Sequence, residues 1–347
     1  MQKARETGCF LKKICYFCRM KEEVSIRLIT HTQDLPDLKS KSFFHSVEFF
    51  QIVEKTPMQK PCMVIAIDGQ GRIVGHLLAI ISFHRSLLPP LAYSHCHVYG
   101  EGEYAAEGAE KDRIFGMMLK ALTERLTRKL CLYIEFSDLS TKMFGYGVFR
   151  ENGYFPIQWQ KVHNSLHSKS PMERLSEKTK TKIRNAEKRG VSSDIATPGS
   201  KDMQDAVKLL KRYFLLKPRR VVPNAKIFDM LAESGKCKVF VTKHNGRVIG
   251  TCVCFFFAGN AYMWQLAARR KSFMMYSPAE FTVWSALKHA HEAECRHFYF
   301  LDAGLPFKRN PMREFILNFG GKQVAEYRWF RIQLPLVGKI IDWMYNE

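Results

Sequence analysis

PCMVIAIDGQGRIVGHLLAII (residues 61–81) and KCKVFVTKHNGRVIGTCVCFF (residues 236–256) are two versions of one pattern, separated by an offset of 175 residues. Each stretch is a β-rich run, a turn built on DGQG or HNG, and a second β-rich run, which predicts a β-hairpin. The identical positions, written as pairs, are Cys62 and Cys237, Val64 and Val239, Gly71 and Gly246, Arg72 and Arg247, and Gly75 and Gly250. The chain therefore contains one unit twice.

The segments that follow the two hairpins have the same order of elements: a strand, a helix, another strand and a closing turn. In the first copy they are LAYSHCHVYG (91–100), a helix over residues 109–129, LCLYIEFSD (130–138) and FRENGYF (149–155). In the second copy they are AYMWQLAA (261–268), a helix over residues 278–294, HFYFLDA (297–303) and FILNFGG (315–321). A repeat of this length is too long for a solenoid and implies two similar α/β domains.

We expect the N-terminal domain to cover residues 20–163 and the C-terminal domain to cover residues 164–347. MERLSEKTKTKIRNAEKRG (172–190) predicts a strongly basic helix near the start of the second domain, ended by Gly190. Met20 opens a more ordinary sequence than the segment before it. We therefore expect residues 1–19 to be a disordered or non-native extension.

The composition describes a strongly basic protein. The chain has 347 residues, and its 54 Lys and Arg against 33 Asp and Glu give a formal net charge of +21. A charge excess of this size favours an anionic partner, which includes nucleic acid, an anionic membrane face and a phosphate-bearing substrate or cofactor. A basic surface without such a partner is the other explanation.

The ten cysteines are scattered and form no paired set with zinc-ligand spacing, so we expect no metal. A reduced, cytoplasmic chain fits this distribution. No apolar run reaches the length that spanning a bilayer requires. LPLVGKIIDWMYNE (334–347) places apolar residues on one side of a short helix, which either packs on the protein's own core or gives peripheral membrane contact.

Three segments carry a resemblance to a known family. RLSEKTKTKIRNAEKRGV (174–191), FFHSVEFFQIVEK (43–55) and the run from Pro278 through FYFLDAG to FILNFGG resemble motifs of the FemAB family of aminoacyl and acyl transferases, within the GNAT acyltransferase superfamily. The resemblance covers residues 25–332. It implies an α/β fold of two tandem GNAT-like domains, each a mixed, mainly antiparallel sheet flanked by helices, and an enzyme that transfers an acyl or aminoacyl group to an amine.

One departure from the family pattern bears on the donor. Family members that use aminoacyl-tRNA carry a Phe-Lys pair before the final Phe-Gly, where this chain has Phe315 and Ile316. This favours an acyl-CoA thioester as donor. Aminoacyl-tRNA, with a cell-wall or lipid-linked acceptor, is the first alternative, because Lys308, Arg309 and Arg313 lie close by in sequence. A non-catalytic binder of RNA or anionic lipid on the same scaffold is the third hypothesis.

LAARRKSFMMYSPAEF (266–281) contains the predicted donor site. Ser277 as N-cap, Pro278 at the first helical position and Glu280 at the third predict a capping box. In the resembled fold the donor pyrophosphate lies at this helix N-terminus. We therefore expect its phosphates to contact Arg269, Arg270, Lys271 and Ser277. Solvated surface charge is the competing explanation.

The same place in the first copy is acidic. Its four carboxylates, Glu101, Glu103, Glu107 and Glu110, would repel a pyrophosphate. We therefore expect the donor in the second copy. The first copy then either holds the acceptor or only supports the fold.

The basic helix places Lys180, Arg184 and Lys188 one turn apart on one face. With Lys308 they form the predicted binding site for an anionic, phosphate-rich or lipid-linked acceptor; a solvated face explains them equally simply. By the resemblance Asp302 is the best-placed catalytic carboxylate, followed by Tyr276 and Glu280. Structural explanations exist for Asp302, as a turn acceptor, and for Glu280, as a capping partner.

Overall fold

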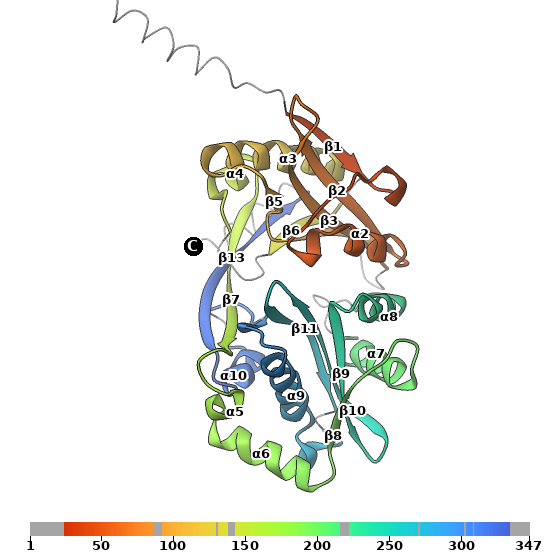
Figure 1. Cartoon of the computed structure of the whole chain (residues 1–347), viewed down its shortest axis with the longest axis vertical. Coiled ribbons are helices and arrows are strands. Elements are labelled where there is room, and N and C mark those ends of the chain that lie inside the picture. The colour runs from red at the N-terminus through yellow and green to blue at the C-terminus, as the bar shows by residue number, and fades with distance from the viewer. Residues whose placement is uncertain are drawn as a thin grey trace, which may run out of the picture.

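One mixed, mostly antiparallel sheet runs through the whole molecule, in the order β1-β2-β3-β4-β6-β13-β7-β12-β11-β10-β9-β8, with β5 paired to β3 (Figure 1). The computed structural model describes residues 24–85, 92–129, 131–137, 143–215, 222–269, 271–301, 303–307 and 309–333. The predicted fold class is confirmed. Residues 1–19 and the segment 334–347 lie outside the described residues.

The strands are β1 Ser25–Ile29, β2 Gln59–Ile67, β3 Ile73–Arg85, β4 Ala92–Tyr99, β5 Glu103–Tyr104, β6 Tyr133–Ser137, β7 Phe155–Ser165, β8 Ser192–Ile195, β9 Cys237–His244, β10 Arg247–Phe257, β11 Asn260–Ala268, β12 His297–Phe300 and β13 Lys322–Ile332. The helices are η1 Thr32–Asp34, η2 Phe43–His45, α2 Val47–Glu54, α3 Gly108–Arg128, α4 Tyr146–Glu151, α5 Pro171–Arg174, α6 Glu177–Lys188, α7 Lys201–Phe214, α8 Lys226–Glu233, η3 Met274–Tyr276, α9 Pro278–Glu292 and α10 Pro311–Leu317.

The sheet order reveals that the two halves exchange their last strands. β7 ends the first half of the chain but pairs with β12 of the second half, whereas β13 ends the second half but pairs with β6 of the first. β7 and β13 also pair with each other over nine residue pairs, from Lys322 opposite His163 to Phe330 opposite Phe155. The two strands run side by side between the halves in Figure 1. The predicted boundary between residues 163 and 164 falls inside β7.

The repeat is visible in the backbone as well as in the sequence. Val74 and Ile249, which are 175 residues apart, are each the residue skipped where the hairpin register shifts. The glycine that follows each of them is required by packing. A Cβ on Gly75 would lie 2.8 Å from the Tyr104 ring, and one on Gly250 would lie 2.9 Å from the Pro278 carbonyl oxygen. The two hairpins are therefore one structural device used twice.

Helices cover both faces of the sheet. On one face α3 and α4 pack on the first half, and α6 and α9 pack on the second half, in two separate hydrophobic clusters. On the other face a single cluster joins α2 and η2 of the first half to α7 and α8 of the second. Within it the Phe44 ring lies 4.9 Å from the Phe255 ring and 4.4 Å from the Tyr99 ring. The halves therefore share a core as well as strands.

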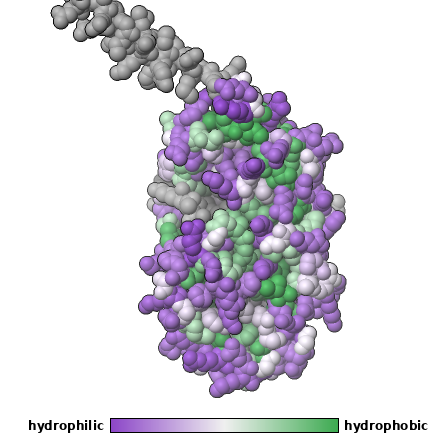
Figure 2. Space-filling model, in the orientation of Figure 1, coloured by the Kyte–Doolittle hydropathy of each residue, from purple (hydrophilic) through white to green (hydrophobic). Residues whose placement is uncertain are grey.

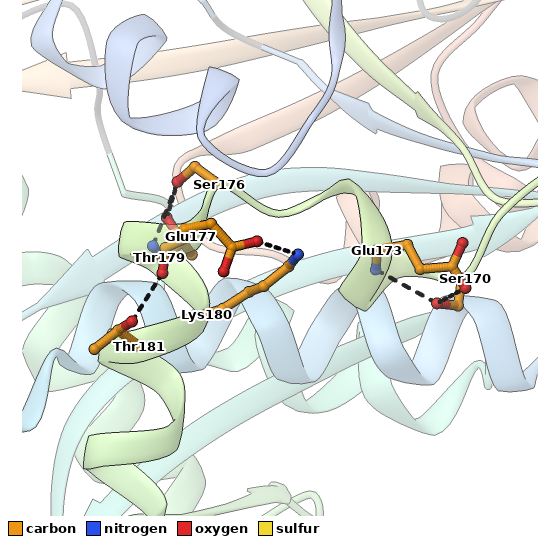
Figure 3. Close-up of polar contacts among 7 residues, drawn as sticks. All are labelled: Ser170, Glu173, Ser176, Glu177, Thr179, Lys180 and Thr181. Atoms are coloured by element: carbon orange, nitrogen blue, oxygen red, sulfur yellow. Dashed lines mark hydrogen bonds and ion pairs between the residues drawn. The ribbon is translucent and has the colours of Figure 1, made fainter.

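The predicted basic helix is two helices. α5 ends at Arg174, and α6 begins at Glu177 because the Ser176 hydroxyl accepts a hydrogen bond from the Thr179 backbone N–H at 3.3 Å. Figure 3 shows this cap and the equivalent one in α5, where the Ser170 hydroxyl accepts from the Glu173 backbone N–H. The prediction of a continuous helix from residue 172 was wrong because it overlooked the N-cap serine. Gly190 follows the helix end with a φ of 76°, as predicted.

The exchanged strand leads to a prediction about folding. Trp329 of β13 is 2% exposed and stacks on Phe149 of the first half, with ring centroids 4.7 Å apart. Trp329→Ala should lower the free energy of unfolding by about 3–5 kcal/mol, because it leaves a cavity in the core of the first half. Urea unfolding followed by fluorescence and circular dichroism should still give one coincident transition, because the halves share strands.

Val324→Ala is the matched control, because this β13 side chain is 40% exposed. It should change the free energy of unfolding by less than about 0.5 kcal/mol. Two resolved transitions in the wild type would contradict the coupling of the halves through the exchanged strands.

Candidate functional site

A cavity of about 760 Å³ lies between the two halves. Its walls come from α2, β3, β4 and β6 of the first half and from the α7–α8 region, β10, β11 and β13 of the second. On the face of the molecule that Figure 2 shows, apolar side chains lie along the middle and hydrophilic side chains border them. A cavity of this size is sufficient for a small substrate and the reacting end of a carrier.

Two strands of the first half give the cavity its polar floor. Alternate residues of β4 line it, namely Tyr93, His95, His97 and Tyr99, and so do alternate residues of β6, namely Tyr133, Glu135 and Ser137. The residues between them, such as Val98 and Ile134, are fully buried in the core of the first half. None of the cavity residues was predicted. The sequence YSHCHVY (93–99) has an aromatic ring at every second position, which predicts that one face of this strand carries Tyr and His side chains. Sequence analysis took it only as a strand.

The second half opens toward the cavity at a split between two parallel strands. β11 and β12 pair from Asn260 opposite His297 to Met263 opposite Phe300. β11 then continues to Ala268 paired with β10 alone. Trp264, Gln265 and Leu301 line the cavity at this split. Gln265 Oε1 is buried there without a hydrogen-bond partner in the part of the chain that the structure describes.

The equivalent strands of the first half end together. β4 and β6 pair as far as Tyr99 opposite Ser137, and β4 itself ends at Tyr99. In both halves one more backbone hydrogen bond follows the last pair, from Gly100 N–H to the Ser137 carbonyl at 2.7 Å and from Leu301 N–H to the Met263 carbonyl at 3.3 Å. The difference over the described residues is that β11 continues to Ala268 beyond its last pair with β12, whereas β4 does not continue beyond its last pair with β6.

A chain of charged side chains links the first half to this split. Arg328 of β13 donates from Nη1 to Glu135 Oε1 at 3.0 Å and from Nη2 to the Leu301 carbonyl at 2.8 Å. Arg328 also lies over the Trp159 ring, 4.3 Å from its centroid. Glu326, two residues before Arg328 on β13, is buried and forms an ion pair with Lys161, with 3.0 Å between Oε2 and Nζ. One guanidinium thus fixes a carboxylate of the first half beside the backbone of the second.

The predicted capping box does not form. Ser277 has a left-handed backbone, with φ of 44°, and its side chain makes no capping hydrogen bond to α9. Glu280 instead pairs with Lys182 of α6 at 2.5 Å, and the Arg189 guanidinium donates to the Met275 carbonyl. The prediction was wrong because it considered only the local sequence, whereas α6 packs against η3 and α9 and recruits these groups.

Three arginines gather beside the predicted donor residues. Arg269 follows β11, and its Nε donates to the Val248 carbonyl at 3.2 Å. Burial lowers the pKa of Arg269, and the neighbouring charges of Arg247 and Arg212 lower it further, with Asp205 opposing them. Like charges that raise one another's energy in this way favour a bound anion. Sequence analysis included Arg269 in its donor site but missed the other two.

Comparison with the first copy of the repeat strengthens this reading. Arg72, the counterpart of Arg247, is paired with Asp68 at 2.8 Å. The counterpart of Asp68 in the second copy is Lys243, which pairs elsewhere, with Asp194 at 2.7 Å. The second copy has thus replaced the neutralising carboxylate by a cation.

The acidic residues of the first copy act as structural acceptors. Glu101 accepts a hydrogen bond from the Phe144 backbone N–H at 2.7 Å. Glu103 accepts from the backbone N–H groups of Lys41 and Ser42. Glu110 pairs with Arg113. The bonds of Glu101 and Glu103 tie the loop before α3 to the rest of the first half, whereas the Glu110 pair lies within α3.

The remaining predicted residues that the structure describes do not line the cavity. Tyr276 stacks near His244, with ring centroids 4.1 Å apart, and Lys180 pairs with Glu177 at 2.7 Å (Figure 3). Arg184, Lys188 and Lys271 are exposed. α6 lies at the far end of the second half, away from the cavity (Figure 1). Asp302, Arg270 and Lys308 lie outside the described residues.

Within the described ranges, no group of three or more metal-binding side chains exists. In the same ranges, no helix has the length and apolar character needed to cross a membrane. The cavity itself offers neutral rings, hydroxyls and the Glu135–Arg328 pair, beside the split between β11 and β12.

The cavity histidines are held neutral. Burial, reinforced by the charge of Arg328, lowers the pKa of His97 to about 3. Burial, together with the nearby His84 and His97, lowers the pKa of His95 to about 3 as well. The two rings are bonded as neutral groups, His97 Nε2 to Ser137 Oγ at 2.6 Å and His95 Nδ1 to His84 Nε2 at 2.8 Å. At neutral pH the cavity floor therefore carries hydrogen-bonding groups without positive imidazolium charge.

These shifts predict how stability depends on pH. The unfolded chain protonates its histidines near pH 6.5, whereas folded His97 resists protonation until about pH 3. The free energy of unfolding should therefore be highest above pH 6.5 and fall as the pH decreases, by about 1.4 kcal/mol per pH unit for each such histidine. Urea unfolding at pH 7.5, 6 and 5 gives the slope of the free energy of unfolding against pH. In His97→Gln this slope should be smaller than in the wild type by the contribution of about one proton. An unchanged slope in His97→Gln would contradict the assignment.

Residues 174–309 match the sequence profile of the acetyltransferase (GNAT) domain, and no curated protein sequence matches the chain. FemX has the same fold, with a TM-score of 0.59 at 10% identity over 87% of this chain and 94% of FemX. A tandem GNAT protein from the clavulanic acid biosynthesis pathway gives 0.55 at 11% identity over 90% and 99%. L-PGS from Bacillus licheniformis gives 0.53 at 11% identity over 86% and 92%. Residues 174–309 therefore match the acetyltransferase (GNAT) domain family, and the chain as a whole has the fold of FemX.

Proposed function

We propose that this protein transfers an acyl group from an acyl-CoA-type thioester to an amine in the central cavity. The observation that carries this proposal is the split between β11 and β12, where a strand pair of the second half opens into a cavity floored by the first half. A thioester threaded through the split would present its carbonyl carbon to an acceptor in the cavity. Closeness of this kind supplies much of the rate enhancement in acyl transfer.

The donor's phosphates would contact the arginine cluster Arg212, Arg247 and Arg269. This cluster lies where β11 ends, and among the described residues no salt bridge joins Arg247 to a carboxylate as one joins Arg72 to Asp68. The GNAT profile matches this half of the chain. Ile316, at the position where tRNA-using family members carry Lys, is fully buried in the core of the second half. A packing role for this residue supports the thioester over aminoacyl-tRNA.

Aminoacyl-tRNA is the second candidate donor, and one observation favours it. α6 exposes Lys178, Arg184, Lys188 and Arg189 to solvent, over a longer surface than the phosphates of CoA require. FemX and L-PGS, whose fold the chain shares, fit a donor and acceptor of the aminoacyl-transfer type. In this case the acceptor would be a cell-wall or lipid-linked amine, and the location would be cytoplasmic with peripheral membrane contact.

The donor is tested by thermal unfolding with and without ligand. Acetyl-CoA at 100 times its dissociation constant should stabilise the folded chain by about 2.7 kcal/mol and raise the melting temperature accordingly. Arg247→Ala and Arg269→Ala should each weaken binding about tenfold or more, because each removes a charge-assisted bond to phosphate. The shift is referred to the melting temperature of each variant without ligand.

Arg72→Ala is the matched control, because Arg72 occupies the same repeat position in the first half. It should retain the wild-type response to acetyl-CoA. A salt-sensitive gain with tRNA and none with acetyl-CoA would favour the second candidate. A gain with RNA or anionic vesicles alone, without any group transfer, would support the non-catalytic binder and sink both transferase proposals.

A further inference from the structure

We propose that Glu135 binds the ammonium group of the acceptor and takes its proton, and that the acceptor is a primary amine on an apolar or aromatic body. The inference rests on the proposed function, because it names the acceptor and the catalytic residue of the same site. It assigns the first half of the chain a part in the chemistry.

The position of Glu135 is the first argument. It belongs to β6 of the first half, yet Arg328 joins its Oε1 to the Leu301 carbonyl through two hydrogen bonds of 3.0 and 2.8 Å. Leu301 lies at the split, where its backbone N–H donates to Met263 just beyond the last strand pair. The Arg328 guanidinium therefore bridges the Glu135 carboxylate and the split between β11 and β12, where a thioester would enter the cavity. Arg328 acts here as a positioning residue.

The charge of the cavity lining is the second argument. Among the described residues that line it, Glu135 is the single carboxylate, and Arg328 and Lys211 are the two permanent cations. Its side chain is 15% exposed, and a carboxylate can accept several more hydrogen bonds than the one from Arg328. The charge of Arg328 is shared, because its Nε also lies 3.9 Å from Glu326. An ammonium ion is the amine form that would gain most from this site.

The other walls determine what the ammonium is attached to. Tyr93, His95 and Tyr133 face the cavity as neutral rings, and the His95 and Tyr133 rings are stacked with centroids 5.0 Å apart. Phe83 and Met58 are 36% and 51% exposed and also line the cavity. Neutral and apolar walls accept a hydrophobic body and impose a desolvation cost on a second charged group.

The proposed step balances as follows. Glu135 takes one proton from the ammonium, and the free amine nitrogen attacks the thioester carbonyl carbon. The new C–N bond forms and the C–S bond breaks with its electron pair on sulfur. The second proton lost by nitrogen goes to the leaving thiolate, and Glu135 releases its proton to water. The products are an amide, a thiol and one proton.

The test uses the full chain with 2-phenylethylamine and its neutral analogue 2-phenylethanol, and measures binding by titration calorimetry without donor. The wild type should bind the ammonium about tenfold or more tightly than the alcohol, and Glu135→Gln should lose that preference while binding the alcohol as before. Glu135→Asp keeps the charge and should retain part of the preference. Glu124→Gln on α3, on the opposite face of the sheet, is the matched control and should behave as wild type.

A donor arm separates this inference from the proposed function. Glu135→Gln should show the wild-type melting shift with acetyl-CoA, but a lower kcat for amine-dependent thiol release. If acetyl-CoA does not bind, the thioester proposal fails while the amine comparison still tests Glu135. If the wild type does not prefer the ammonium to the alcohol, or if Glu135→Gln prefers it equally, the role of Glu135 is overturned.

Discussion

Backbone hydrogen bonding between β7 and β13 holds this molecule together. β13 completes the sheet of the first half and β7 completes that of the second, and the pairing of β7 with β13 joins the two parts into one 13-stranded sheet. Since every residue in such a ladder bonds to a neighbour, neither half can satisfy its inner strand edge alone. Arg328 comes from β13 and bonds to both Glu135 of the first half and Leu301 of the second. The cavity that these three residues line therefore lies at this junction.

Duplication supplied the scaffold, and divergence between the copies supplied the site. Both hairpins keep the skipped residue and the packed glycine, since these are needed wherever the unit folds. The charges differ. Arg72 is paired with Asp68, whereas Arg247 and Arg212 both act as neighbouring positive charges on Arg269. The parallel strands also differ, because β11 continues to Ala268 beyond its last pair with β12, whereas β4 ends with its last pair with β6. The two halves therefore offer different surfaces to a ligand.

The errors of local reasoning came from one source. Ser277 and Glu280 have the spacing of a capping box, but α6 lies against them and Lys182 takes the carboxylate. In the acidic stretch before α3, local reasoning missed a structural role: Glu101 and Glu103 accept backbone hydrogen bonds from segments distant in sequence. That this stretch would repel a phosphate stays a prediction. A polar side chain near a helix end can bond to any group that the fold brings within reach, and that group often comes from another element.

The sequence by itself determined the repeat, the order of strands and helices, the α/β class and the family resemblance, because periodicity, turn residues and motif spacing are local properties. It also placed Arg269 among the cations near the end of β11. Only the tertiary structure decided the strand exchange, the gathering of Arg212, Arg247 and Arg269, and the cavity built on Glu135 and Arg328. Those depend on contacts between residues as far apart as Glu135 and Arg328, which nothing in their local sequence links.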